Sequence, residues 1–289
     1  MDYVLYILII ICIWAMLSIS ENLVLGYAGL FSFCQAAFFG VGAYTSAIMY
    51  MSFGINIFVS SIVGAFFASI VGTLIALPSL RLKGDYFFIA TLALQVIIFH
   101  LFINLEGLTR GPLGIFGIPR PEFFGRSLNT NISYVSFGIL FLAVSYFFSN
   151  RVCNSSFGLT LKAIREDEIA AEAVGKDILK FKVLIFVLSA IWASFAGSLY
   201  VFFLGGVDPF AFTLNESIFI LSIAIVGGLG NMKGAILGAI VLIIIPELLK
   251  FAAIPEEIAH QTRNLLYGLL LIIFMMFRPQ GLIGEYKLK

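Results

Sequence analysis

Residues 158–175 read GLTLKAIREDEIAAEAVG, and they are the one charged helical segment in a chain that otherwise avoids charge. Apolar residues recur in this segment roughly every three or four positions, which predicts a short amphipathic helix with an apolar stripe of Leu161, Ile164, Ile169 and Val174. Ser155 and Ser156 are suitable caps for its start, and Gly175 suits the left-handed residue that ends many helices. Taken alone, the segment is as typical of a solvated loop helix as of a docking helix. The rest of the chain therefore decides its role.

The composition predicts an integral membrane protein. Hydrophobic residues make up 61% of the 289 residues and charged residues only 11%, and the mean hydropathy is +1.07. Soluble domains carry about 25% charged residues. The net charge of +1 gives no attraction for nucleic acid. The three cysteines, Cys12, Cys34 and Cys153, are too scattered for a disulfide framework, and we expect free thiols.

Apolar runs that could cross a hydrocarbon layer of about 30 Å recur along the whole chain. The start of the chain has neither a basic leader nor a cleavage site, so we expect the first run to be a retained span. The fold class expected is all-α, a polytopic bundle with about 8–10 spans. The runs lie near residues 3–20, 36–52, 56–77, 86–104, 133–149, 182–204, 216–230, 234–250 and 264–278.

Basic residues orient these spans, because Lys and Arg in short loops stay on the cytoplasmic side. One alternating topology places four basic sets inside: Arg81 with Lys83, the basic residues of loop 150–181, Lys233, and Arg278 with Lys287 and Lys289. The C-terminus is then cytoplasmic, and loops 105–132, 205–215 and 251–263 are outside. Three arginines of the first outer loop do not fit the rule, namely Arg110, Arg120 and Arg126.

Two glycine-rich interruptions break the apolar pattern. The first, ENLVLGYAGLFSFCQ at 21–35, contains Gly26 and Gly29 and predicts a broken or re-entrant helix buried in protein. The alternative is that these glycines only allow helices to pack closely, and the side on which the N-terminus lies depends on this choice. The second interruption spans 227–231. Paired breaks in two halves of a transporter are typical of an internal repeat around a midplane pathway.

The outer loop contains a stretch rich in proline and glycine, GLTRGPLGIFGIPRPEFFG at 107–125. Pro112, Pro119 and Pro121 exclude a regular helix, while interspersed Ile and Phe residues can pack on neighbouring elements. The loop suits a cap over the mouth of a pathway or a docking surface. A structural lid on the neighbouring spans is the alternative.

Chemistry for energy supply or catalysis is absent from the sequence. There is no G-x-x-x-x-G-K-[ST] phosphate loop, and His100 and His260 have no ligand-like spacing to carboxylates. We expect ionisable residues inside the membrane to be nearly missing, which argues against an ion-coupled carrier. The sequence therefore predicts that the chain forms half of a transport path and that its energy comes from other subunits.

Uncharged polar residues fall within or beside the spans and are candidates for lining a path. Thr91 and Gln95 are four apart and share a helix face, and Gln35 and Tyr44 mark another face. Together with Gly26 and Gly29, they are the candidate path residues. The alternative for each side chain is a hydrogen bond between helices, which contributes about 0.6 kcal/mol in membranes.

Six motifs in order resemble the membrane permease subunits of bacterial ABC importers for branched-chain amino acids, the LivM type in particular. The resemblance covers nearly the whole chain. The motifs are GYAGLFSFCQAAFFGVGAYTSA at 26–47, RLKGDYFFIATLAL at 81–94, NLEGLTRGPLGIFGIP at 104–119, LKAIREDEIAAEAVG at 161–175, GGLGNMKGAILGA at 227–239 and FRPQGLIG at 277–284.

The resemblance implies a subunit that works with several partners. These are a second, LivH-like permease, two cytoplasmic ATPase subunits that use ATP and Mg²⁺, an extracytoplasmic solute-binding protein and membrane lipid. This chain would then hold no cofactor and no metal, would not itself be an enzyme, and would form one transmembrane domain over 1–289 in the bacterial inner membrane.

The resemblance also gives the opening segment a role as a coupling helix. The family signature E-A-A-x-x-x-G matches at Ala170, Ala171 and Gly175, but Ile169 replaces the leading glutamate. The small alanines would let the helix enter a groove on the ATPase. The expected coupling residues are Lys162, Arg165, Glu166, Glu168, Ala170, Ala171 and Gly175.

The function expected is transport of branched-chain or related amino acids, with this chain forming half of the path. Similar permeases handle urea, short amides and other small solutes, and no residue here distinguishes these solutes. An ion-coupled secondary carrier is the rival class. A membrane enzyme would need a catalytic constellation that the sequence lacks.

Overall fold

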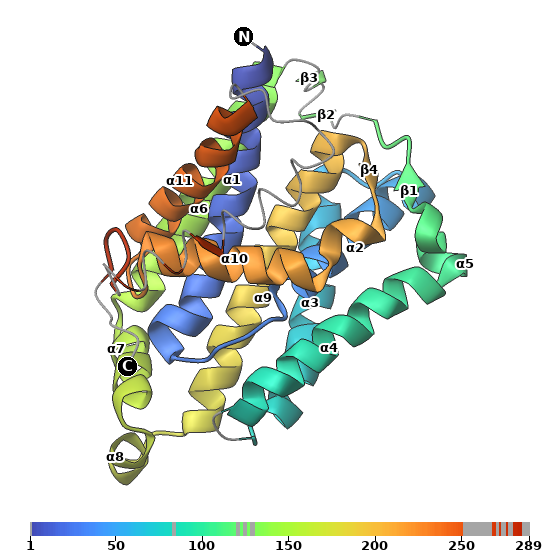
Figure 1. Ribbon diagram of the computed structural model, residues 1–289. Helices are drawn as coiled ribbons and strands as arrows, with labels where there is room; N and C mark the ends of the chain where they lie inside the picture. Colours follow the sequence, from blue (N-terminus) through green and yellow to red (C-terminus); the bar gives the residue numbers. More distant parts are fainter. Residues whose placement is uncertain are drawn as a thin grey trace.

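Long apolar helices account for nearly all of the fold (Figure 1). The computed structural model describes residues 2–82, 85–119, 122–123, 126–127, 131–250, 268–269, 272, 276 and 280–284. The main helices in these ranges are α1 (Asp2–Asn22), α2 (Gln35–Phe53), α3 (Ile57–Ser79), α4 (Asp85–Asn104), α6 (Asn131–Cys153), α9 (Ile178–Leu204), α10 (Leu214–Gly227) and α11 (Met232–Lys250). The expected all-α polytopic bundle is confirmed.

Six of the described helices are long and apolar enough to cross a membrane, and a bent pair adds a seventh candidate. The bent pair is α10 and α11, whose axes differ by 117°. With 14 residues, α10 is about 21 Å long, which is too short for a hydrocarbon layer of about 30 Å. The expected span at 216–230 is therefore a half-span that lies across the direction of α1 and α9 in Figure 1. The expected span at 264–278 falls almost entirely outside the described residues.

The centre of the bundle is a close crossing of α2 and α9. A Cβ on Gly42 would lie 2.3 Å from the Ser194 carbonyl oxygen, and one on Gly197 would lie 2.1 Å from the Phe39 carbonyl oxygen. The two backbones therefore touch, as small residues permit in membranes. A further contact joins the hydroxyls of Ser46 and Ser198, which are 2.6 Å apart.

The first glycine-rich interruption is a true break in the helices. After α1 the chain forms one π-helical turn, η1 (Leu23–Tyr27), and residues 29–34 have no helical structure before α2 begins. Gly29 adopts φ +69°, a left-handed conformation that L side chains rarely take. The segment is largely buried, although Gly29 and Phe31 are exposed. The prediction of a broken segment near 22–35 is confirmed.

The connections gather at the two ends of the bundle (Figure 1). At one end lie α5 (Glu106–Thr109), the 3-10 turns η2 (Gly111–Leu113) and η3 (Pro209–Phe212), and four short strands, β1 (Ile115–Phe116), β2 (Glu122–Phe123), β3 (Arg126–Ser127) and β4 (Gly206–Val207). Strands β1 and β4 pair antiparallel, with Ile115 opposite Val207, and β2 pairs with β3. This pairing brings the two predicted outer loops together.

The opposite end carries α7 (Ser156–Glu166), α8 (Glu168–Ala173) and the turn between α3 and α4. These are basic loops that the sequence places in the cytoplasm. The N-terminus lies at the far end of α1 from α7 and α8 in Figure 1. The N-terminus and the basic loops therefore lie at opposite ends of the bundle.

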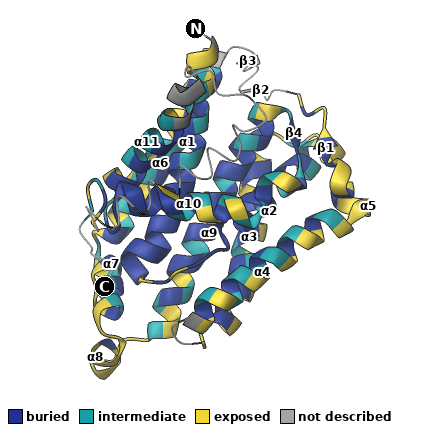
Figure 2. Cartoon of the chain, in the orientation of Figure 1, coloured by how far each residue is buried: buried dark blue, intermediate teal, exposed yellow. Residues whose placement is uncertain are grey.

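Burial follows the position of each helix in the bundle (Figure 2). In α1 and α2, 56% of the most apolar stretch is buried, whereas in α4 only 28% is buried. Helix α4 therefore lies at the periphery, and it exposes large side chains that include Tyr86, Ile89, Ile97 and Leu101. Of the apolar residues in the outer loop, Ile115 and Ile118 are buried and Phe116 is exposed.

Candidate functional site

The charged segment forms two helices rather than the single helix that its pattern predicts. Helix α7 ends at Glu166, Asp167 is extended, and α8 begins at Glu168. The Asp167 carboxylate accepts hydrogen bonds from the backbone N–H groups of Ile169, at 2.9 Å, and Ala170, at 3.1 Å. Because a short acidic side chain caps a new helix better than it continues an old one, the helix breaks at this residue.

The break divides the predicted apolar stripe between two surroundings. Leu161 and Ile164 on α7 are buried, but Ile169 is 80% exposed and Val174 is 77% exposed. The predicted ends of the segment agree better with the structure than the predicted apolar stripe does. Ser155 precedes α7, although its hydroxyl donates to Val152 instead of capping the helix, and Gly175 has the expected left-handed φ of +79°. The part of the stripe on α8 therefore faces away from the bundle.

Helix α7 is anchored on the first break by two of the predicted coupling residues. Arg165 donates a hydrogen bond from Nη1 to the Gly26 carbonyl, and its Nη2 lies 3.0 Å from Glu166 Oε1. The Nζ of Lys162 lies 5.4 Å from the centre of the Tyr27 ring, in cation–π contact. These two basic side chains thus contact η1 of the same chain.

Helix α8 is tied to the bundle by an ion pair. Lys182 Nζ on α9 lies 2.6 Å from Glu168 Oε1, and the Lys182 side chain is only 9% exposed. Ala171 is buried, whereas Ala170 is exposed. We define the α8 surface as Ile169, Ala170 and Val174, three exposed apolar residues of the signature stretch. Of the two signature alanines, only Ala170 is free to enter a groove on another protein.

The two glycine-rich breaks meet directly. Asn22, the last residue of α1, donates from Nδ2 to the Asn231 carbonyl at 2.8 Å and accepts from the Gly230 N–H through Oδ1 at 2.9 Å. A Cβ on Gly26 would lie 2.5 Å from the Gly230 nitrogen. The hydrogen bonds of Asn22 and the lack of a side chain at Gly26 therefore let two interruptions that are about 200 residues apart in the sequence lie in direct contact.

The polar candidates for the path are buried in hydrogen bonds between elements. Gln35 accepts from the Ser20 hydroxyl at 3.0 Å and donates to Ser189 at 2.6 Å. The Thr91 hydroxyl lies 3.3 Å from the Phe33 N–H, which donates to it. The Gln35 contacts match the interhelical alternative, since they join α2 to α1 and α9. The Thr91 contact joins α4 to the non-helical part of the first break. The role of both residues in a path stays a prediction.

Gln95 and Tyr44 are buried as well. Gln95 accepts from the Ala37 N–H at 2.7 Å and donates to the Phe212 carbonyl at 2.9 Å. The Tyr44 ring stacks on Phe102 with ring centres 4.8 Å apart. Gly26 and Gly29 lie against Asn22 and Arg165, respectively.

Replacing Gln95 by leucine is expected to destabilise the protein. The change leaves one buried N–H and one buried carbonyl unpaired, and each costs about 1–3 kcal/mol. The melting temperature of the detergent-purified chain should fall clearly, while the Ile97→Ala variant, at an exposed position two residues away on α4, should change it little. An unchanged melting temperature in Gln95→Leu would show that this network does not hold α2 and η3 on α4.

Glu21 is a residue that the sequence reasoning missed. It lies in the first candidate span, is completely buried, and neither carboxyl oxygen makes a hydrogen bond within the described residues, although Gln35 lies beside it. The expectation that ionisable residues are nearly absent from the membrane is therefore wrong at this position. One signal in the sequence was the position of Glu21 directly after an apolar run. The glycines that follow it suggested that the run ended before Glu21, so this residue was placed outside the span.

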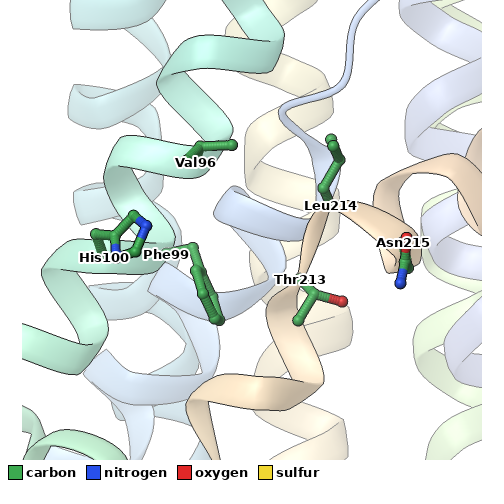
Figure 3. A pocket seen from close by; sticks show the side chains of 6 residues that line it. All are labelled: Val96, Phe99, His100, Thr213, Leu214 and Asn215. Carbon is green, nitrogen blue, oxygen red and sulfur yellow. The ribbon is translucent and has the colours of Figure 1, made fainter.

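A pocket of about 260 Å³ lies between α4 and the start of α10. Figure 3 shows Val96 and Phe99 pointing from α4 toward the first residues of α10. The lining is mainly apolar and is formed by six residues: Val96, Phe99, His100, Thr213, Leu214 and Asn215. None of the predicted path residues lines this pocket. Within the described ranges, no cluster of three or more His, Cys, Asp or Glu side chains could hold a metal ion.

Comparison with known proteins gives the family. A family model described as "branched-chain amino acid transport system / permease component" matches residues 3–275. This chain belongs to that permease family. The permease is a multi-pass membrane protein, as its candidate spans also indicate.

Individual relatives agree with this assignment. The permease is 32% identical to the LivM permease protein of the high-affinity branched-chain amino acid transport system of Escherichia coli K12, over 94% of this chain and 68% of that protein. It is 28% identical to a probable LivM permease protein of Methanocaldococcus jannaschii, over 98% of this chain and 94% of the other. The LivH permease protein of Escherichia coli K12 is 26% identical over 94% of this chain and 91% of that protein. No solved structure matches the permease.

Proposed function

We propose that this permease forms half of the path of an ATP-driven importer for branched-chain or closely related amino acids. Its partners would be a LivH-like permease, two cytoplasmic ATPase subunits that use ATP and Mg²⁺, and an extracytoplasmic solute-binding protein. The bacterial inner membrane is the proposed location, with the C-terminus in the cytoplasm.

The observation that carries this proposal is the α8 surface. Ile169 and Val174 are exposed apolar residues beside the small Ala170, at the end of the bundle where the basic loops lie. An exposed apolar helix face of this kind suits docking into a groove on a partner protein. The acidic side chains around it, Glu166, Asp167 and Glu172, are also exposed and would contact the rim of such a groove.

Glu168 and Lys162 fit the proposal in a different way. Glu168 holds α8 on α9 through Lys182, and Lys162 holds α7 on Tyr27. A docking helix must be attached rigidly if it is to transmit a push to the spans. We therefore assign these two residues to the attachment of the coupling loop, while the ATPase contact falls mainly on α8.

The pocket between α4 and α10 supports an amino acid as the solute. Val96, Phe99 and Leu214 offer an apolar wall for an aliphatic side chain, and the lining also includes the polar residues His100, Thr213 and Asn215. Because α4 is the most exposed span, this pocket lies at a face where a second permease can complete it. Urea and short amides would leave most of the apolar wall uncovered.

The test is the transport spectrum of the reconstituted complex. Liposomes that contain this permease and its partners should take up radiolabelled leucine, and excess unlabelled isoleucine or valine should suppress the signal. Excess urea or acetamide should leave it unchanged. If urea or acetamide suppressed the uptake of radiolabelled leucine and isoleucine and valine did not, the proposal of branched-chain amino acids as the solute class would be wrong.

A further inference from the structure

Arg165 connects two sets of residues that the sequence treats as unrelated. It belongs to the predicted coupling segment, yet its guanidinium donates to the carbonyl of Gly26, a candidate path residue in η1. A Cβ added at Gly29 would lie only 2.6 Å from the Arg165 Cγ. The Arg165 side chain is only 10% exposed. It is therefore inserted into the first break.

The contact between Arg165 and Gly26 lies at the point where the helix ends. Gly26 lies in the last residues of η1, where the chain leaves the helix and regular helical hydrogen bonds end. A charged donor at such a carbonyl makes a stronger bond than a neutral one. The path of the backbone through the break is thus held partly by a side chain from the coupling loop.

The first break is in turn tightly joined to the second. Asn22 bonds to both Gly230 and Asn231, and Gly26 lies so close to Gly230 that no Cβ fits between them. A displacement of η1 must therefore move the junction between α10 and α11 or break the Asn22 bonds. The half-span α10 leads from this junction to the pocket at its other end.

We propose that Arg165 is a positioning residue for transport, which ties the coupling loop to both glycine-rich breaks so that movement of α7 changes the start of α10 and the path beside it. This proposal rests on the proposed function, because it assumes that α7 and α8 are moved by ATPase subunits. The contacts run from Arg165 to Gly26 and Gly29, and from Asn22 to Gly230 and Asn231.

The experiment measures solute imported per ATP hydrolysed in liposomes that contain the complete complex. Arg165→Ala should lower this ratio by about tenfold, a typical size for coupling between sites, while the rate of ATP hydrolysis changes little. Arg165→Lys can still donate one hydrogen bond to Gly26 and should give an intermediate ratio. Arg151→Ala removes an exposed arginine from the end of α6 and serves as the matched control, with an unchanged ratio.

A second variant separates positioning from simple stabilisation. Asn22→Ala should also lower the ratio, and the double variant with Arg165→Ala should lower it by less than the product of the two single effects, because both act on one line of contacts. Independent, multiplicative effects would overturn the proposal. If Arg165→Ala fails to assemble, Arg165→Lys decides, and a wild-type ratio in that variant also overturns it.

Two further results would count against the proposal in different ways. A wild-type ratio in assembled Arg165→Ala, or uptake and hydrolysis that fall in parallel with the amount of complex, would overturn the role of Arg165 alone. Absence of ATP-dependent uptake in the wild-type complex would overturn the proposed function and this inference with it.

Discussion

Replacement of Ala170 by tryptophan is expected to reduce ATP-driven uptake to the level of empty liposomes. Ala170 is the exposed small residue of the α8 surface, and a large ring there would hold the ATPase groove away from α8. The neighbouring Ala171 is buried within the permease, so a bulky residue there would disturb the packing of α8 instead. The measurement is uptake of radiolabelled leucine by the reconstituted complex.

Ala170→Ser is the control at the same position, since it keeps a small side chain and should retain most of the uptake. Membrane insertion and the melting temperature should be the same in both variants, because the Ala170 side chain is exposed and its replacement disturbs no buried packing. Normal uptake in Ala170→Trp would show that α8 does not dock on the ATPase.

Gly26→Ala is expected to have the largest effect on stability. The added methyl would lie 1.9 Å from Asn22 Oδ1 and 2.5 Å from the Gly230 nitrogen, and the second neighbour is backbone that cannot rotate away. Overpacking of this kind costs about 1–3 kcal/mol, and displacement of Asn22 would also break its bonds to the second break. The yield of monodisperse protein in detergent and its melting temperature should both fall.

Gly107→Ala is the matched control, because a Cβ at Gly107 would have no neighbour within 4 Å. Its exposed position in α5 predicts an unchanged or slightly raised melting temperature. Equal stability of the two variants would contradict the close approach of the two breaks.

The sequence was most informative about features that depend on local pattern. Continuous apolar runs predicted the six long described spans within a few residues of their helices, because burial in a membrane requires about 20 apolar residues in a row. The expected span at 216–230 was wrong, because α10 is too short to cross a membrane. Gly26 and Gly29 predicted the first break, because glycine permits the left-handed backbone that Gly29 adopts. The Gly175 stop was also confirmed, for the same reason.

Contacts between distant segments could not be predicted in this way. The amphipathic pattern of 158–175 gave one helix, since periodicity does not register that Asp167 can cap a second helix. Nothing in the sequence places Arg165 on Gly26, because that contact depends on how α7 docks on the bundle. Gln95 shows the same limit, since its position on a helix face does not reveal that it bonds to Ala37 and Phe212.

Glu21 gives the rival mechanism a structural argument. A buried carboxyl without a hydrogen-bond partner among the described residues, inside a candidate span, is the kind of group that ion-coupled carriers use. The proposed function assigns the energy source to ATP and the coupling to α8, and it gives Glu21 no part in driving transport. The two mechanisms therefore make opposite predictions about what drives uptake.

The most direct measurement is leucine accumulation in liposomes under two separate driving forces. The complete complex with ATP and Mg²⁺ on the ATPase side should accumulate leucine, and collapse of proton and sodium gradients should not change the rate. The two permeases without ATPase subunits should accumulate none. Accumulation by the permeases alone under an imposed ion gradient, with loss of that activity in Glu21→Gln, would contradict an ATP-driven importer.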